Sequence, residues 1–371
     1  MQTALDATSL AMIKTASAQN AGQITSSASS MFAANFNHPE ITNAAVTATY
    51  DSSSGILTLY GTASQKNAFM GIAGYSQTGL SAVSKSMLGN RMWPICVLIT
   101  NPTDGHTLLV SGASTIDFTN CMVQVNTNNW DAVEARDTSY IHSSNGNNCF
   151  VGDIHYGDVT PAKNPTCTMF ADPYTTGYTL PASASTCTYT NLKVTVAGTT
   201  LSPGTYCGGL TIQKNATLSP GLYIMKAGDF NVSGTNTNVT ATGVTVLMTG
   251  SNAGITINTT GTITMSPADS SAAGVFAGFS FFLDQSTTNY LDKSQVQSAT
   301  MNMSGVLYLK GQKLIPDKNA VITINTGVII ADEILPVGGS KLNLTGTLSS
   351  PTAVQQAMKK SLPSNTPVLV Q

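Results

Sequence analysis

The chain has 371 residues, of which 42% are hydrophobic and only 9% are charged, and its formal net charge is −2. This length fits two domains or one large elongated domain, and the apolar fraction supports a real core, so wholesale disorder is excluded. The sparse charge, with arginine only at Arg91 and Arg136, argues against nucleic-acid binding and against electrostatic docking to anionic lipid.

Residues 1–92 predict a small α+β domain. Small apolar residues recur at helical spacing over residues 4–16, and alternating β-branched runs predict strands at 45–50, 56–60 and 80–87. Residues 68–73 are typical of a short helical segment. The run from Asp51 to Gly55 has a loose likeness to a metal-dependent adhesion motif, but Gly55 stands where that motif needs a hydroxyl ligand, so we interpret the run as a turn.

From residue 93 to residue 350 the pattern changes to short β-branched runs punctuated by Gly, Asn and Pro. The segment 200–206 (TLSPGTY) recurs as 217–223 (TLSPGLY), seventeen residues later. That period is too long for hairpins of a β-sandwich, the competing all-β fold, and it suits stacked, near-equivalent turns of chain. We therefore predict a right-handed parallel β-helix (solenoid) over 93–350. The N-terminal domain and a tail at 351–371 are expected to cover its two ends, because an open sheet edge invites aggregation.

Six cysteines lie in the middle of the chain at spacings that do not suit zinc ligands. An even count outside metal spacing predicts three disulfides in an oxidising compartment, although reduced buried thiols of a cytosolic protein are an alternative. We favour sequential pairs that link neighbouring turns, namely Cys96–Cys121, Cys149–Cys167 and Cys187–Cys207. Oxidation requires export, yet the printed start carries no secretory signal, so we expect a longer natural start that Met1 replaces.

Several segments resemble TadG-like proteins of the bacterial Tad/Flp pilus assembly family. They are Trp93-Pro-Ile-Cys-Val-Leu, residues 109–117 and 120–126, Cys187-Thr-Tyr-Thr-Asn, Leu201-Ser-Pro-Gly-Thr-Tyr-Cys-Gly-Gly-Leu-Thr-Ile, residues 242–249 and residues 279–285. Residues 4–11 are similar to the stretch that follows the single N-terminal membrane helix of these proteins. The resemblance implies a minor pilin-like, structural or adhesive protein with no catalytic residues. It also implies other pilins and pilus-assembly proteins as partners, and anchoring in the inner membrane through an N-terminal helix that this chain lacks.

Parallel β-helices also carry polysaccharide lyases and glycosidases, so an enzyme is the main rival hypothesis. A lyase needs clustered acids beside a cation, and a glycosidase needs two carboxylates roughly 5–9.5 Å apart. The acids here are scattered: Glu134 and Asp137 flank Arg136, Asp332 and Glu333 are adjacent and would face opposite sides of a strand, and Asp284 and Asp292 are separated by a polar loop. We therefore predict no catalytic site.

The densest polar group comprises Asp153, His155 and Asp158, with His142 nearby. On a strand, Asp153 and His155 would share a face, which suits a metal ion or a proton relay. The alternative, which we favour, is an irregular loop held by Cys149 and Cys167. We accordingly predict no metal and no cofactor. The expected function is structural or adhesive, in the periplasm or on the cell surface, with surface glycans as further partners; a free-standing carbohydrate-binding adhesin is the other alternative.

Overall fold

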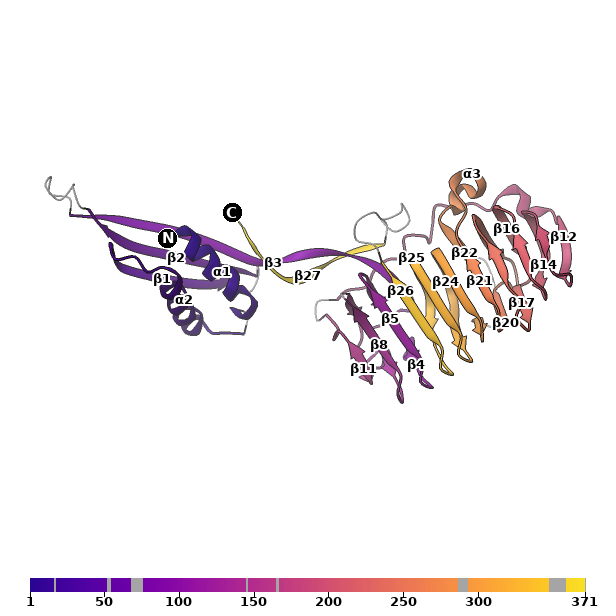
Figure 1. The fold of residues 1–371 in the computed structure, drawn as a ribbon, viewed down its shortest axis with the longest axis horizontal. Helices are drawn as coiled ribbons and strands as arrows, with labels where there is room; N and C mark the ends of the chain where they lie inside the picture. Colours follow the sequence, from indigo (N-terminus) through magenta and orange to yellow (C-terminus); the bar gives the residue numbers. More distant parts are fainter. Residues whose placement is uncertain are drawn as a thin grey trace. The chain divides into compact units, whose positions relative to one another are not determined.

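A computed structural model describes residues 1–16, 18–51, 55–67, 76–144, 146–164, 167–285, 293–346 and 358–370. The chain forms two units, one of Met1–Arg91 with Ser361–Gln371 and the other of Met92–Lys360 (Figure 1). Residues 361–371, which we expected in a tail capping the β-rich region, therefore group with the N-terminal residues. The boundary falls within one long strand, β3 (Gln77–Ile99).

The first unit packs two helices against an antiparallel sheet. Helices α1 (Gln2–Ala16) and α2 (Ala21–Asn35) precede strands β1 (Ile41–Asp51), β2 (Ile56–Lys66) and β3. Helix α2 begins at a capping box, in which the side chains of Asn20 and Gln23 each accept a hydrogen bond from the other's backbone N–H. The three predicted strands are confirmed, and α2 was not foreseen as a separate helix. The expected helix at 68–73 and residues 52–54 of the turn lie outside the described residues.

Apolar side chains of both helices and of the sheet form the core of this unit. Leu5 and Phe32 on the helices are buried in one cluster with Leu57 and Leu59 of β2. The helices also lie close to the sheet backbone, since the Thr25 hydroxyl donates to the carbonyl of Ala48 at 3.2 Å.

The second unit consists of parallel strands arranged in three ladders. In spatial order the first ladder comprises β12 (Tyr189–Val194), β14 (Gly204–Ile212), β16 (Gly221–Lys226), β19 (Val244–Thr249), β22 (Phe279–Leu283), β24 (Thr300–Asp317), β25 (Val321–Ile334), β3, β6 (Met122–Val125) and β9 (Asn147–Phe150). The second comprises β12, β14, β17 (Phe230–Gly234), β20 (Ile255–Thr259), β23 (Lys293–Gln297), β24, β25, β4 (Leu108–Val110), β7 (Val133–Ala135) and β10 (Ile154–Tyr156). The third comprises β13 (Thr199–Leu201), β15 (Ala216–Leu218), β18 (Val239–Ala241), β21 (Thr262–Met265), β24, β25, β26 (Lys341–Thr345), β5 (Thr115–Thr119), β8 (Tyr140–Ser144) and β11 (Asp158–Thr160).

The predicted right-handed parallel β-helix is wrong. The strand pairings close into a parallel barrel of eight strands, β14–β16–β19–β22–β24–β23–β20–β17, and the remaining strands lie outside this ring. The physical reason is the length of β14 and β24. Strand β14 continues around a bend and pairs in the first and second ladders, and β24 bends further and pairs in all three, so the first and second ladders are joined into a closed ring.

The order of strands in space also differs from the order in the chain. Strand β3 enters the first ladder between β25 and β6. Strand β26 pairs with β5, so residues 341–345 lie beside 115–119. In Figure 1 the yellow-orange strands β25 and β26 accordingly stand next to the purple strands β4 and β5.

A long connection between β11 and β12 makes this order possible. Residues 167–188 of this connection are called here the connecting segment. The segment contains the 3-10 helix η2 (Ala182–Ser185) and crosses the outer side of the first ladder. Asn126, directly after β6, exchanges hydrogen bonds of 2.8 and 2.9 Å with the backbone of Phe170. Further along, the Thr205 hydroxyl of β14 donates to the carbonyl of Ser183 at 2.8 Å. The segment therefore carries the chain from one end of the ladders to the other.

One apolar cluster fills the interior, from Cys96 to Leu344. In the third ladder alternate residues point inward, as in β15, where Ala216 and Leu218 are buried and Thr217 is exposed. The strands β6, β19 and β22 of the first ladder are buried on both faces. Their outer side is covered by the connecting segment, the short helix α3 (Ser270–Ala273) and the 3-10 helix η3 (Gly274–Phe276).

The repeated TLSPGxY segments occupy equivalent positions, as predicted. Thr200 pairs with Thr217 and Leu201 with Leu218 on neighbouring strands β13 and β15. Each tyrosine bonds back to its own turn, Tyr206 to the carbonyl of Ser202 at 2.6 Å and Tyr223 to that of Ser219 at 2.9 Å. Their rings stack at 5.7 Å. The Ser-Pro-Gly turn thus supplies the carbonyl that satisfies a buried phenol.

Replacing this phenol tests the role of the repeat. Tyr223 is fully buried, and its hydroxyl also lies 2.8 Å from the carbonyl of Leu201. We expect Tyr223→Phe to lower the free energy of unfolding in urea by about 1–2 kcal/mol, because buried acceptors lose their donor. Tyr156→Phe, at a tyrosine that is 60% exposed in the same unit, is the matched control and should change stability by less than about 0.5 kcal/mol. Equal effects of the two variants would contradict this assignment.

An engineered disulfide tests the order of the strands. Asn343 and Asp117 are register partners on β26 and β5, and paired strands lie about 4.8 Å apart, within disulfide range. We expect Asp117→Cys with Asn343→Cys to form a new disulfide, detected by non-reducing peptide mapping. Thr264→Cys with Asn343→Cys is the control: these residues are three strands apart in the same ladder, which is too far for a bond. Failure of the first pair to link would refute the pairing of β26 with β5.

Candidate functional site

A continuous row of polar side chains, most of them hydroxyls and amides, runs along the outer face of the third ladder. One register position on each successive strand contributes to it. In spatial order its members are Thr200, Thr217, Thr240, Thr264, Asn302, Thr323, Asn343, Asp117, His142 and Thr160. The members from Thr200 to Asn302 are exposed, and those from Thr323 to His142 are partly buried. We call this set the polar row.

The polar row is regular because the pairing is parallel and in register. Side chains that point outward from neighbouring strands then stand one above the other, about 4.8 Å apart. From Thr200 to Asn343 the row carries no ionisable group. Its members can therefore donate and accept hydrogen bonds without the cost of desolvating a charge.

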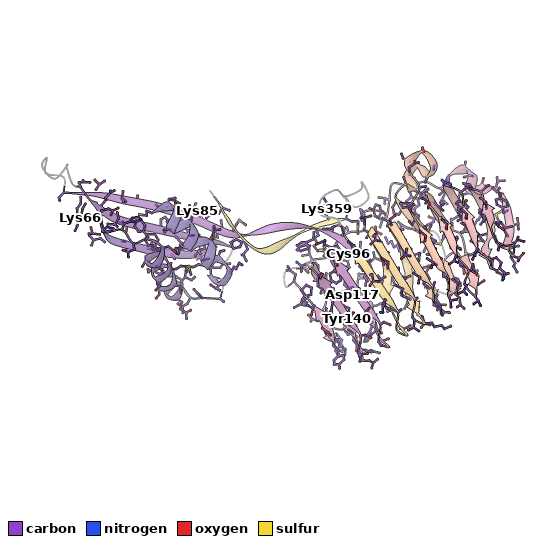
Figure 2. All side chains as sticks on the ribbon, viewed as in Figure 1. Lys66, Lys85, Cys96, Asp117, Tyr140 and Lys359 are labelled. Carbon is purple, nitrogen blue, oxygen red and sulfur yellow. A yellow bond between two sulfur atoms is a disulfide. The ribbon has the colours of Figure 1, made fainter. Side chains whose placement is uncertain are left out.

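The row ends in a hollow of about 390 Å³ lined by Asp117, Phe118, Thr119, His142, Ser143, Ser144 and Thr160. Tyr140 donates to Asp117 at 3.3 Å, and both residues are labelled in Figure 2. The Tyr140 ring also stacks on His142 at 4.1 Å, and His142 Nε2 lies 2.9 Å from Asp158. This end of the row is thus the part that carries aromatic and titratable groups.

The polar group predicted around Asp153 is separated by the fold. Asp153 forms an ion pair with Lys163, and His142 pairs with Asp158. His155 instead joins residues from two other strands, as described next. Of the four residues grouped from the sequence, His142 and Asp158 therefore meet, and the favoured irregular loop is replaced in part by strands β10 and β11.

Three ladder-forming segments bring His106, Glu134 and His155 together. His106 Nε2 lies 2.9 Å from Glu134 Oε2, and His155 Nδ1 lies 3.8 Å from Glu134 Oε1. Arg136 donates two hydrogen bonds of 2.9 Å to the same carboxylate. These bonds, opposed by burial and aided by the charges of Arg136 and both histidines, hold the pKa of Glu134 below its ordinary value.

The acids considered for catalysis are engaged in structural contacts. Asp332 accepts a hydrogen bond from Asn101 at 3.1 Å, and Glu333 pairs with Lys313 at 3.0 Å. Asp284 accepts hydrogen bonds of 2.9 Å from Tyr178 and Thr249. Asp292, its suggested partner, lies outside the described residues.

A phenol and carboxylate network fixes the connecting segment to the first ladder. The Tyr308 hydroxyl donates to Asp172 at 2.9 Å, and Tyr178 packs edge-on against Phe282 at 4.8 Å. Burial is the main cause that raises the pKa of Tyr308 and Tyr174, and it raises the pKa of Tyr178 to about 12. These phenols therefore stay neutral in the folded protein well above pH 10.

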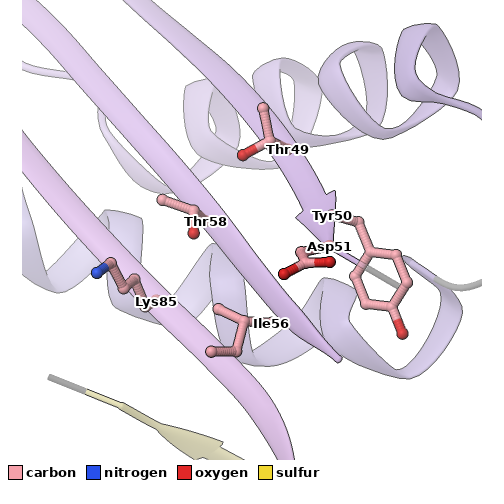
Figure 3. A pocket seen from close by; sticks show the side chains of 6 residues that line it. All are labelled: Thr49, Tyr50, Asp51, Ile56, Thr58 and Lys85. Carbon is pink, nitrogen blue, oxygen red and sulfur yellow. The ribbon is translucent and has the colours of Figure 1, made fainter. Parts of the chain in front are cut away.

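A shallow hollow of about 250 Å³ lies on the first unit and is shown in Figure 3. It lies over the end of β1, the start of β2 and the middle of β3. Its walls are formed by Thr49, Tyr50, Asp51, Ile56, Thr58 and Lys85. Thr49, Thr58 and Lys85 are register partners on the three strands. The hollow combines one acid, one cation and several hydroxyls, a composition suited to polar contact.

All three predicted disulfides are present: Cys96–Cys121, Cys149–Cys167 and Cys187–Cys207. Their Cα atoms are 5.8, 5.2 and 5.6 Å apart. The second bond fixes the start of the connecting segment to β9, and the third fixes its end to β14. Three disulfides indicate an oxidising, extracytoplasmic compartment.

Comparison with protein-family models found no match, and comparison with curated proteins found no significant similarity. Among the described residues, no helix has the length and apolar character that crossing a bilayer requires. The function must therefore be argued from two features, the polar row and the group of His106, Glu134 and His155, called here the His/Glu cluster.

Sequence reasoning missed His106 and Asp131, which completes the His/Glu cluster from one side: its Oδ2 lies 3.4 Å from His106 Nδ1. A signal was present in the chain, since His106, Glu134 and His155 recur at intervals of 28 and 21 residues, close to the spacing of the cysteines. Such spacing places residues on neighbouring strands of one ladder.

The raised tyrosine pKa values predict alkaline instability. Below pH 10 the phenols are neutral in both states. Between about pH 10 and about pH 12 the phenol of the unfolded chain loses its proton while the buried phenol of Tyr178 keeps it, so the free energy of unfolding falls. Its contribution is therefore fully present below pH 10 and is lost as pH rises toward about 12. We expect the urea midpoint to fall over this window, and to fall less steeply in Tyr178→Phe. A parallel decline in both proteins would contradict the role of Tyr178.

Proposed function

We propose that this chain is a non-enzymatic structural and adhesive component of a bacterial Tad/Flp pilus, exposed outside the inner membrane. The observation that carries the proposal is the polar row, a rigid and nearly uncharged array on a disulfide-braced β unit. The resemblance to TadG-like proteins supports the pilus assignment. Its strongest segments, 187–191 and 201–207, meet at the Cys187–Cys207 bond.

The polar row suits attachment to a polar surface such as a glycan. Many weak hydrogen bonds at regular spacing add up only if the array is rigid, because ordering flexible side chains and loops costs entropy at each contact. Here the backbone ladder and the filled core keep the row in place. Contacts made by hydroxyls and amides are also insensitive to salt, unlike ion pairs.

The small α+β unit suits packing with other pilus proteins. Helix α1 exposes the small residues Thr3, Ala7, Ala11 and Thr15. Small residues permit close approach of helices. In this proposal the natural protein is anchored in the inner membrane by an N-terminal helix, and its partners are other pilins and pilus-assembly proteins.

A strain that lacks the gene tests the proposal when pilus assembly and surface attachment are scored separately. We expect loss of attachment to cellulose, with or without loss of filaments. Complementation with Thr240→Arg should lower attachment about tenfold, since a bulky cation interrupts the middle of the row. Asn258→Arg, at an exposed outward position of β20 in the second ladder, is the matched control and should restore normal attachment.

Two outcomes would count against the proposal. Normal filaments and normal attachment in the deletion strain would remove the pilus role. Equal attachment by the Thr240→Arg and Asn258→Arg strains, with equal amounts of protein at the cell surface, would remove the polar row as the attachment surface. Binding of the purified chain to cellulose, together with attachment by cells that carry this gene but no pilus genes, would favour a free-standing adhesin.

A further inference from the structure

We infer that His106, Glu134 and His155 form a binding site for a divalent transition-metal ion of the zinc class. The three residues come from successive levels of the second ladder: His106 precedes β4, Glu134 lies on β7 and His155 lies on β10. Strand β7 pairs with both neighbours, so the backbone itself brings the three side chains to one place.

The donor atoms have a spacing that suits tetrahedral coordination. Donors at about 2.0–2.1 Å from a zinc ion lie roughly 3.4 Å from one another. The observed separations from the Glu134 carboxylate, 2.9 Å to His106 and 3.8 Å to His155, fall on either side of that value. One ligand atom from each residue lies within 4.8 Å of the other two. Two imidazoles and one carboxylate form a common protein ligand set for zinc.

Asp131 provides an independent observation that points to a ligand. It is nine-tenths buried, its Oδ1 atom has no hydrogen-bond partner, and its Oδ2 atom lies 3.4 Å from His106 Nδ1. A carboxylate behind a metal-binding histidine orients the ring and raises its basicity. With the Nδ1 proton facing Asp131, the lone pair of His106 Nε2 faces Glu134 and the proposed ion.

The backbone around His106 is arranged for this contact. His106 has φ of 54°, a left-handed conformation that few non-glycine residues adopt. The preceding Gly105 leaves room for Asp131, because a Cβ atom there would lie 2.3 Å from Asp131 Oδ1. Left-handed backbone held by surrounding contacts is common at ligand sites.

In the absence of metal, Arg136 is hydrogen-bonded to the carboxylate of Glu134. Its two hydrogen bonds hold the carboxylate in place, yet its side chain is 47% exposed, so it can move away at low cost. A bound cation would repel the guanidinium. Arg136 therefore competes with the metal, whereas in a purely structural cluster it would only stabilise Glu134.

A metal at this point would brace the end of the ladders. In the described part of the chain, β10 is paired along one edge only, with β7. The ion would link the chain before β4 to β7 and β10, as the disulfides link other neighbouring levels. This inference is independent of the attachment role proposed for the third ladder.

Zinc titration of the untagged full chain, with its disulfides intact and after removal of metal by a chelator, tests the inference. We expect calorimetry to show one Zn²⁺ site, and Co²⁺ to give the visible absorption of an ion bound by nitrogen and oxygen in a site of low coordination number. His155→Ala should weaken Zn²⁺ binding by more than about a hundredfold, and Asp131→Asn by about tenfold. His142→Ala removes an imidazole outside the cluster and is the matched control, with unchanged affinity expected.

Replacement of Arg136 should change the Zn²⁺ affinity in the opposite direction to replacement of a ligand, which makes the test specific. Arg136→Gln should tighten Zn²⁺ binding several-fold, because it removes a cation that competes for Glu134. Absence of a Zn²⁺ site in the wild-type chain, or equal affinity of the wild type and the His106→Ala/His155→Ala double variant, would overturn the inference. A cooperative thermal unfolding transition, measured for each variant without metal, is the control that it is folded. The side chain of His155 is 42% exposed, so its replacement is expected to have little effect on the core.

Discussion

Parallel pairing in register is the constraint on which the second unit depends. Because side chains alternate along a strand, such pairing places inward residues on inward residues and outward residues on outward ones. The continuous apolar core, the stacked Tyr206 and Tyr223 and the polar row are three results of this single rule. The His/Glu cluster is a fourth, since it needs one suitable residue at nearly the same level of three neighbouring strands.

The order of the strands shows that this rule acts without regard to position in the chain. Residues 341–345 complete the ladder begun by 115–119, and the polar row passes from Asn343 to Asp117 without interruption. The cost of bringing distant segments together grows only slowly with the length of chain between them. Disulfides at both ends of the connecting segment offset part of that cost by restricting the unfolded chain.

The two candidate functional sites, the polar row and the His/Glu cluster, differ in their chemistry and in their position in the fold. The polar row is long, regular and almost uncharged, which suits repeated weak contacts with an extended polar surface. The His/Glu cluster is compact and carries buried carboxylates, and it suits a small cation. Both rely on rigid strands rather than loops, which positions their side chains more precisely.

The sequence by itself determined the composition of each surface, the strands of the first unit, the equivalence of the two TLSPGxY segments and all three cysteine pairs. These are local or nearest-neighbour properties, and the spacing of residues along the chain points to them. Only the tertiary structure decided that the ladders close into a ring, that β26 lies beside β5 and that His106 and Glu134 meet His155. Those outcomes depend on contacts between segments far apart in the chain, and alternating strands of similar composition can satisfy the same pattern in more than one order.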